Sequence, residues 1–188
     1  MDKEKLKRKF IRGNKRAFDT IYSDYSKVMY SICLRYTKNT DEACDILQDS
    51  FIKIYEKRKS FNPDYELGSW IKRIVINTAI DHFNKNKKTI LVEDESFFEE
   101  EDNSTIEIDN STDLKSQLIV ALQNLPEGYR TVFNLYVLDN LTHQEIADYL
   151  KISISTSKSQ LSRARKMLKN VLEEKSIVLK PKCDRERA

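Results

Sequence analysis

The sequence predicts an all-α protein: two small helical domains joined by an acidic, flexible linker, the C-terminal domain being a helix-turn-helix. Two observations favour helices. Apolar residues recur at steps of three and four along most of the chain, the period of an amphipathic helix, and strand patterns are few. Only three glycines and three prolines occur among 188 residues, so few tight turns are expected.

Charge divides the chain into three parts. Residues 1–88 hold 20 basic and 12 acidic side chains, residues 89–112 hold nine acidic and no basic ones, and residues 113–188 hold 13 basic and nine acidic ones. Two basic blocks around an acidic segment indicate two domains that share one polyanion. We therefore predict an N-terminal helical domain over residues 10–88, a linker over 89–112 and a C-terminal domain over 113–175.

Composition argues against several classes of protein. Cys33, Cys44 and Cys183 are odd in number and form no CxxC pair, so a disulfide framework or zinc site is not expected. Cys33 and Cys44 lie in helical patterns and are expected to be small buried hydrophobes. His82 and His143 are isolated. No signal peptide or apolar run of ~18 residues is present, so we expect a cytoplasmic protein without membrane insertion, metal or cofactor.

The N-terminal block predicts three main helices, over residues 17–37, 40–57 and 70–88. Thr40 is the expected N-cap of the second helix, whose inward stripe comprises Leu47, Phe51, Ile54 and Tyr55. A second stripe of the same helix contains Asp45, Gln48, Asp49 and Ile52. It is either a protein-binding face or a solvated one, and the residues alone slightly favour the solvated face.

The loop over residues 58–69 contains Phe61 and Tyr65 among turn formers. Aromatic side chains between basic helices can stack on unpaired bases, or they can close the core. In the predicted helix over residues 70–88, Trp70 and its apolar neighbours lie on one side. The more polar side includes Lys72, Arg73 and Asn77. A basic helix beside an aromatic loop could hold a melted DNA strand, or its cations could simply favour the helix dipole.

Residues 141–168 predict the helix-turn-helix, after a helix that Asn140 can end in left-handed geometry. Thr142 and Glu145 form a capping box for a short helix, Lys151 to Ser153 form a tight break, and Ser153 can cap a second helix. The outer face of that second helix is polar or basic, and residues 151–171 hold no carboxylate. We predict DNA contact rather than a solvated face, through Ser155, Thr156, Lys158, Ser159, Gln160, Ser162, Arg163 and Arg165.

Together these segments resemble a bacterial RNA polymerase sigma factor of the small extracytoplasmic-function (ECF) type, over roughly residues 10–172. Four motifs in order carry the resemblance. They are residues 45–51 (DILQDSF), residues 69–74 (SWIKRI) with Asn77 and Asp81, residues 125–127 (LPE) with Arg130 and Phe133, and the helix-turn-helix from Leu141.

The resemblance implies a role for each segment. Asp45, Gln48 and Asp49, with Ile52 beside them, would dock on the clamp coiled coil of the polymerase large subunit. Phe61 and Asn77 would hold a flipped-out base of the promoter −10 element, and Trp70, Lys72 and Arg73 would contact the same element. The recognition helix would contact the −35 element. The linker would thread towards the polymerase active-site cleft and RNA exit path. The chain would be a promoter-specificity subunit without a catalytic site, binding core polymerase (clamp and flap), promoter DNA and an anti-sigma factor.

Three departures from the family pattern bear on these roles. Lys151 stands where the family turn usually has Gly, so it requires a left-handed backbone. Ser157 replaces a usual Val on the buried side, which gives up about 1 kcal/mol of burial. Gln160 stands where Arg is common, and this shifts base preference away from guanine.

Two rival functions remain. A self-sufficient helix-turn-helix regulator would share the C-terminal half but would leave the Asp45 stripe and the Phe61 loop unexplained. A metal-dependent nucleic-acid enzyme would need converging ligands. Asp45 and Asp49 share one helix stripe while Asp81 lies on another helix, so this rival is the weaker one.

Overall fold

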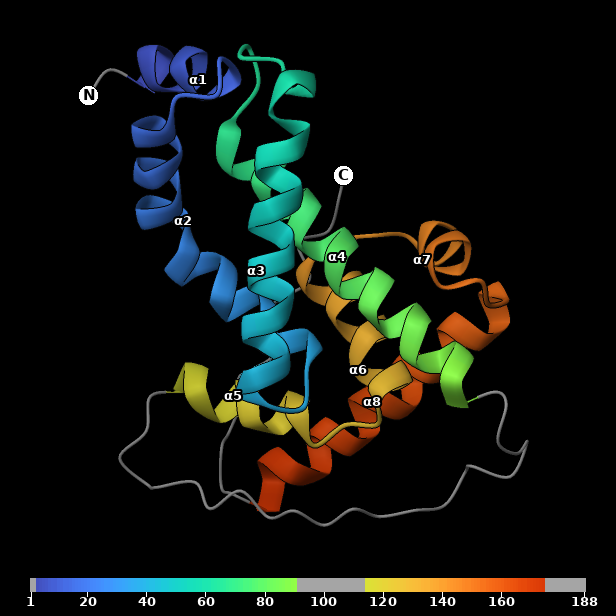
Figure 1. Ribbon diagram of the computed structural model, residues 1–188. Helices are drawn as coiled ribbons and strands as arrows, with labels where there is room; N and C mark the ends of the chain where they lie inside the picture. Colours follow the sequence, from blue (N-terminus) through green and yellow to red (C-terminus); the bar gives the residue numbers. More distant parts are fainter. Residues whose placement is uncertain (1–2, 91–113, 175–188) are drawn as a thin grey trace, which may run out of the picture.

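A computed structural model of the chain describes residues 3–90 and 114–174. These residues are helical wherever they have regular structure, which confirms the all-α prediction (Figure 1). We call α1 to α4 the N-terminal helices and α5 to α8 the C-terminal helices. The N-terminal helices are α1 (Lys3–Ile11), α2 (Lys15–Tyr36), α3 (Thr40–Glu56) and α4 (Leu67–Ile90).

Helices α2, α3 and α4 pack on one another and α1 lies across the end of α2 (Figure 1). The sequence did not predict α1, and the predicted domain began only at residue 10. Helix α1 is largely basic and offers the core just Leu6 and Phe10, four residues apart. Phe10 is fully buried, with its ring centroid 6.4 Å from that of Phe18 and 6.3 Å from that of Trp70. Two core positions in a charged segment are too few for a periodic signal.

The turns between the N-terminal helices have specific causes. Gly13 has φ +78°, and a Cβ there would lie 3.2 Å from Arg58 Nε, so both backbone and space favour glycine. Asn14 caps α2, because its side chain accepts from Ala17 N at 3.0 Å. The prediction that Thr40 caps α3 is wrong: Asn39 does so, accepting from Glu42 N at 2.9 Å.

The expected loop over residues 58–69 is shorter than predicted. A 3-10 turn, η1 (Lys57–Ser60), extends α3, and α4 begins at Leu67. Leu67 is buried, and its burial stabilises a helix that begins there. Gly68 and Ser69 have low helix propensity, which is why the sequence predicted a later start. Only residues 61–66 then join the two helices.

The C-terminal helices are α5 (Leu114–Gln123), α6 (Glu127–Phe133), α7 (His143–Leu150) and α8 (Ile154–Glu174), and a π-helical segment, η2 (Asn134–Leu138), extends α6. Asn140 has φ +58°, which confirms its predicted left-handed geometry after η2. One core of this part contains Ala121, Leu122, Leu125, Ala164 and Leu168.

The two sets of helices lie against each other. Helix α2 contacts α5 and α6, and α4 contacts α7. Val132, Leu135, Ile146, Leu150 and Leu161 belong to the same buried cluster as the core of the N-terminal helices. The predicted linker over 89–112 falls, apart from the end of α4, outside the described residues. The division into two domains therefore stays a prediction.

Candidate functional site

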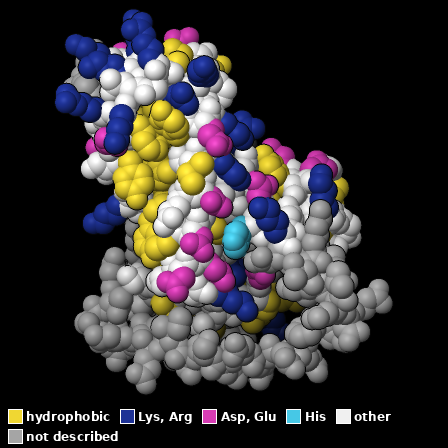
Figure 2. All heavy atoms as spheres, in the orientation of Figure 1, with side chains coloured by type: hydrophobic (Ala, Val, Ile, Leu, Met, Phe, Trp, Pro, Cys, Tyr) yellow, Lys and Arg dark blue, Asp and Glu magenta, His cyan; other side chains and the backbone are white. Residues whose placement is uncertain are grey.

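The second stripe of α3 is an open surface. Asp45, Gln48, Asp49 and Ile52 are all exposed, and none takes part in an ion pair or hydrogen bond between described residues. Acidic side chains gather over the lower half of α3 (Figure 2). The structure therefore brings all four predicted residues together on one accessible face.

Hydrophobic side chains adjoin this stripe over α2 and α3 (Figure 2). Ile52 is 57% exposed, and Tyr22, Val28 and Tyr55 are also exposed. Tyr55 was predicted to point inward and does not: its ring lies 5.1 Å from Phe18 and under the guanidinium of Arg58. Exposed apolar side chains rimmed by polar ones are typical of a protein-binding surface.

The two aromatic side chains of the loop between α3 and α4 differ in exposure. Phe61 is only 3% exposed and lies 5.1 Å from the ring of Trp70, so its ring closes the core. Tyr65 is 70% exposed, at the end of a turn in which Tyr65 N donates to Asn62 O at 3.1 Å. In this structure a base could reach Tyr65 but not Phe61.

Helix α4 carries the other predicted −10 residues. Trp70, Arg73 and Asn77 follow one another at steps of three and four and so share a face. Arg73 is exposed, whereas Trp70 and Asn77 are half-buried. Lys72 lies to the side, where its Nζ is 2.8 Å from Asp139 Oδ1 of the C-terminal helices.

The helix-turn-helix forms as predicted. Thr142 Oγ1 accepts from Glu145 N, and the Glu145 carboxylate accepts from Thr142 N at 2.7 Å, which completes the capping box. The hydrogen bonds that the Glu145 carboxylate accepts from Thr142 N and Thr142 Oγ1 lower the pKa of Glu145. Lys151 adopts φ +55° and ψ +46°, the strained left-handed geometry expected of it. Ser153 Oγ accepts from Thr156 N at 3.0 Å and caps α8.

His143 has a partner that the sequence analysis missed. Its Nδ1 lies 2.9 Å from Ser157 Oγ, and its ring stacks on Tyr136 at 4.5 Å. Ser157 is fully buried, so the hydrogen bond with His143 accounts for a hydroxyl where the family has Val. Partial burial, with Lys158 and Arg165 nearby, lowers the pKa of His143. The pair links the two helices of the motif.

The outer face of α8 carries the predicted −35 residues. Six of them are exposed, namely Ser155, Lys158, Ser159, Ser162, Arg163 and Arg165, while Thr156 and Gln160 are half-buried.

Three side chains of this face contact α6 and η2. Arg163 Nη1 donates to Tyr129 Oη at 3.1 Å, and the Arg165 guanidinium lies 5.8 Å from the ring of Tyr136. The Gln160 amide lies beside Gly128, where a Cβ would approach its Nε2 to 3.3 Å. The Gln160 side chain is therefore half-buried against α6.

Within residues 3–90 and 114–174, no group of His, Cys, Asp and Glu side chains could hold a metal ion. Cys33 is buried, and burial raises the pKa of its thiol to about 12, whereas Cys44 is exposed, contrary to expectation. No described helix is long and apolar enough to cross a membrane.

Comparison with known proteins gives the class first. Residues 21–89 match the family Sigma-70 region 2, and residues 115–168 match Sigma-70, region 4. The first match contains the α3 stripe and α4, and the second contains the helix-turn-helix. This pair of regions, in this order, defines a sigma factor of RNA polymerase.

Relatives that match most of the chain identify the family. The ECF RNA polymerase sigma factor SigW of Bacillus subtilis is 30% identical over 87% of this chain and 92% of its own. The RNA polymerase sigma-H factor of Pseudomonas aeruginosa is 28% identical over 90% and 93%. The chain belongs to the ECF sigma factor family: it binds core RNA polymerase and directs promoter-specific transcription initiation.

A solved structure supports the fold. The sigma factor RpoE of Bartonella quintana, crystallised with the anti-sigma factor NepR, is similar with a TM-score of 0.52 and 24% identity, over 83% of this chain and 96% of that one.

The strain at Lys151 gives a first prediction. Lys151→Gly should raise the free energy of unfolding by about 1 kcal/mol, because glycine adopts the left-handed geometry without a Cβ penalty. Urea unfolding measures the change. Lys151→Ala is the control, since it removes the side chain and keeps the Cβ. Equal stability of the two variants would contradict the assigned strain.

Proposed function

We propose that residues 10–88 bind the polymerase clamp and the −10 element, and that residues 113–175 bind the −35 element. The observation that carries the proposal is the exposed stripe of α3, which a self-sufficient DNA-binding regulator would not need. Run-off transcription with core polymerase on genomic fragments tests it. A chain that binds DNA specifically but neither co-purifies with core polymerase nor stimulates transcription would support the regulator instead.

We further propose that the chain acts in the cytoplasm and contributes no catalytic group, since the polymerase supplies the chemistry. NepR, an anti-sigma factor, binds the structurally similar RpoE. We infer that an anti-sigma factor also restrains this chain. The acidic linker, residues 89–112, is proposed to follow the nucleic-acid path of the enzyme.

The clamp contact rests on chemistry as well as exposure. Asp45 and Asp49 supply charges, Gln48 an amide, and Ile52 an apolar contact at the same face. An apolar centre with charged neighbours is the usual anatomy of a protein interface, in which the charges set orientation and rate.

Charge reversal tests this contact. Asp49→Lys should weaken binding to core polymerase by on the order of 2–5 kcal/mol, because it places like charges at a desolvated interface. The affinity is measured with labelled sigma factor and purified core enzyme. Asp64→Lys, an exposed change in the loop between α3 and α4, is the matched control. Equal affinities of the two variants for core polymerase would show that the α3 stripe is not part of the interface.

The −10 contact is proposed to centre on Tyr65 with Arg73 and Asn77. Tyr65 is the exposed aromatic of the loop on which a splayed base could stack, and Arg73 and Asn77 offer a cation and an amide on the helix that follows. Phe61 can contact a base only if its ring leaves the core. That movement loses the free energy of burying the ring against Trp70.

Two alanine substitutions separate these roles. Tyr65→Ala should leave the fold intact and reduce promoter melting, because lost stacking costs about 1–3 kcal/mol per base. Phe61→Ala should lower the free energy of unfolding by about 3–5 kcal/mol. Permanganate footprinting reports melting, and urea unfolding reports stability. Normal promoter melting by the Tyr65→Ala variant would indicate that Phe61, and not Tyr65, contacts the base.

The −35 contact is proposed to lie on the exposed face of α8. Lys158, Arg163 and Arg165 supply phosphate contacts, and Ser155, Ser159 and Ser162 supply hydroxyls at neighbouring positions. Gln160, whose amide lies beside Gly128, is proposed to read an adenine.

A substitution at Gln160 tests base reading. Gln160→Arg should change preference at one −35 position by roughly 1–3 kcal/mol, from adenine towards guanine. Libraries of −35 sequences are selected with wild-type and variant holoenzyme, and Lys166→Arg serves as a control on the same helix. An unchanged preference would assign sequence reading to the neighbouring serines.

A further inference from the structure

Basic side chains gather at the end of the molecule where α1 lies (Figure 2). Residues 3–16 hold eight basic side chains and one acidic side chain. Four of the cations lie at positions i, i+3, i+4 and i+7 of one helical period, so they share a face. They are Lys5, Arg8, Lys9 and Arg12, all of them exposed, and we call them the α1 stripe. The opposite face of α1 carries Leu6 and Phe10 into the core.

Two further segments bring cations to the same end. The turn η1 contacts α1, and Arg58 of η1 lies beside Gly13, in the turn between α1 and α2. Arg58 Nη1 donates to Tyr55 O at 2.7 Å, so this arginine is held against the molecule. Its neighbours point outward. The exposed cations here are Lys57 and Lys59 of η1 and Lys15 and Arg16 of α2. Together with the α1 stripe, these four form what we call the basic end.

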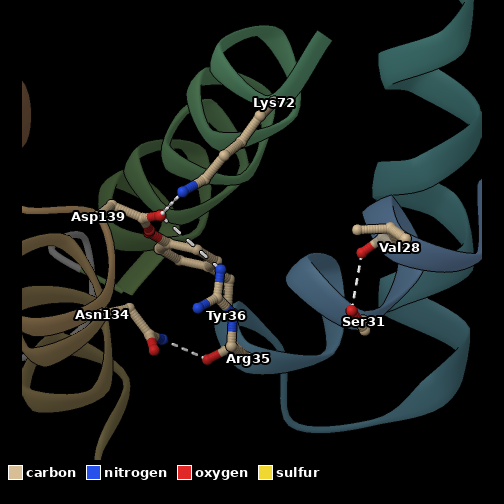
Figure 3. A network of polar contacts seen from close by, with 7 residues as sticks. All are labelled: Val28, Ser31, Arg35, Tyr36, Lys72, Asn134 and Asp139. Atoms are coloured by element: carbon tan, nitrogen blue, oxygen red, sulfur yellow. Dashed lines mark hydrogen bonds and ion pairs between the residues drawn. The ribbon is translucent and has the colours of Figure 1, made fainter. Parts of the chain in front are cut away.

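The cations of the basic end have no carboxylate partner among the described residues, and no side-chain hydrogen bond joins them to one. Other cations of the N-terminal helices do have such partners. Lys7 pairs with Glu4 at 2.9 Å, Lys53 pairs with Asp81 at 3.0 Å, and Lys72 and Arg35 both face Asp139 (Figure 3). Protein surfaces usually intersperse both signs of charge, because like charges repel. Binding of a polyanion would relieve the repulsion within the basic end.

The helix dipole explains only part of this pattern. Arg8 and Lys9 lie in the last turn of α1, where the dipole favours cations. Lys5 lies near the first turn, where the dipole disfavours them. Lys57 and Lys59 belong to a different segment. A binding surface accounts for all of these positions together.

The basic end adjoins the loop between α3 and α4. Lys7 Nζ donates to Pro63 O at 3.0 Å, two residues before the exposed Tyr65. The turn η1 leads directly into the same loop. The α1 stripe extends over about 10 Å of helix. One strand of a DNA duplex carries a phosphate every ~3.4 Å along its axis, so the stripe is long enough to meet more than one phosphate.

We propose that the basic end is a sequence-independent DNA contact, which binds backbone phosphates beside the −10 element. Its position beside that element rests on the proposed function, whereas the phosphate binding does not. Lysine and arginine neutralise phosphates by charge, which requires no particular base sequence. A lipid surface would require apolar side chains on the same face, and the α1 stripe has none. The strand whose bases meet Tyr65 is then held by its backbone at the same end of the molecule.

The first test uses the free full-length chain and a short labelled duplex of arbitrary sequence. Arg8→Gln/Arg12→Gln should lower the slope of log affinity against log salt by about two units, because each phosphate contact contributes about 0.9. Arg8→Lys/Arg12→Lys should keep the wild-type slope, since lysine also neutralises a phosphate. Lys27→Gln/Lys38→Gln is the charge-matched control, because it removes two exposed cations outside the basic end. Urea unfolding checks that each variant is folded.

The second test locates the contact in the holoenzyme. A photoactivatable crosslinker is attached to Arg8→Cys, with Cys44 and Cys183 replaced by serine and the buried Cys33 retained. On a promoter found by run-off transcription, the label should crosslink to DNA next to the −10 element. The same label at Lys27→Cys is the control and should not crosslink to that DNA.

The two tests separate the proposal from the proposed function. A free-chain slope that Arg8→Gln/Arg12→Gln lowers no more than Lys27→Gln/Lys38→Gln would overturn phosphate binding by the basic end. Crosslinks from Arg8→Cys to a polymerase subunit and not to DNA would also overturn it, and would assign the surface to an acidic protein partner. A holoenzyme that binds no promoter would contradict the proposed function, and the slopes of the free chain would still decide whether the basic end binds phosphates.

Discussion

The end of α2 is the constraint on which the arrangement of the two parts depends. A helix cannot satisfy its own last carbonyls, and a buried carbonyl without a donor is costly. Here the donors are amides of Gln123 and Asn134, so α2 is completed only where the C-terminal helices meet it. That requirement fixes which faces of α2 and α4 are covered. It leaves the α3 stripe and the outer face of α8 open for binding.

Features fixed by local chemistry could be predicted from the sequence. The capping box at Thr142, the left-handed residues Asn140 and Lys151, and the cap at Ser153 involve groups no more than four residues apart. The exposed stripe of α3 was also predictable, because one helix period determines both its buried and its open face. The family resemblance added the roles of these residues, which periodicity alone left undecided.

Features that depend on distant partners could not be predicted in this way. Tyr36 and Asp139 are 103 residues apart, and His143 and Ser157 are 14 apart across a turn. The choice between Phe61 and Tyr65 depends on which ring fits against Trp70, a matter of packing shape rather than of residue type. Helix α1 was missed because it has only two core residues, and these can be recognised as core only when the surface they pack against is known.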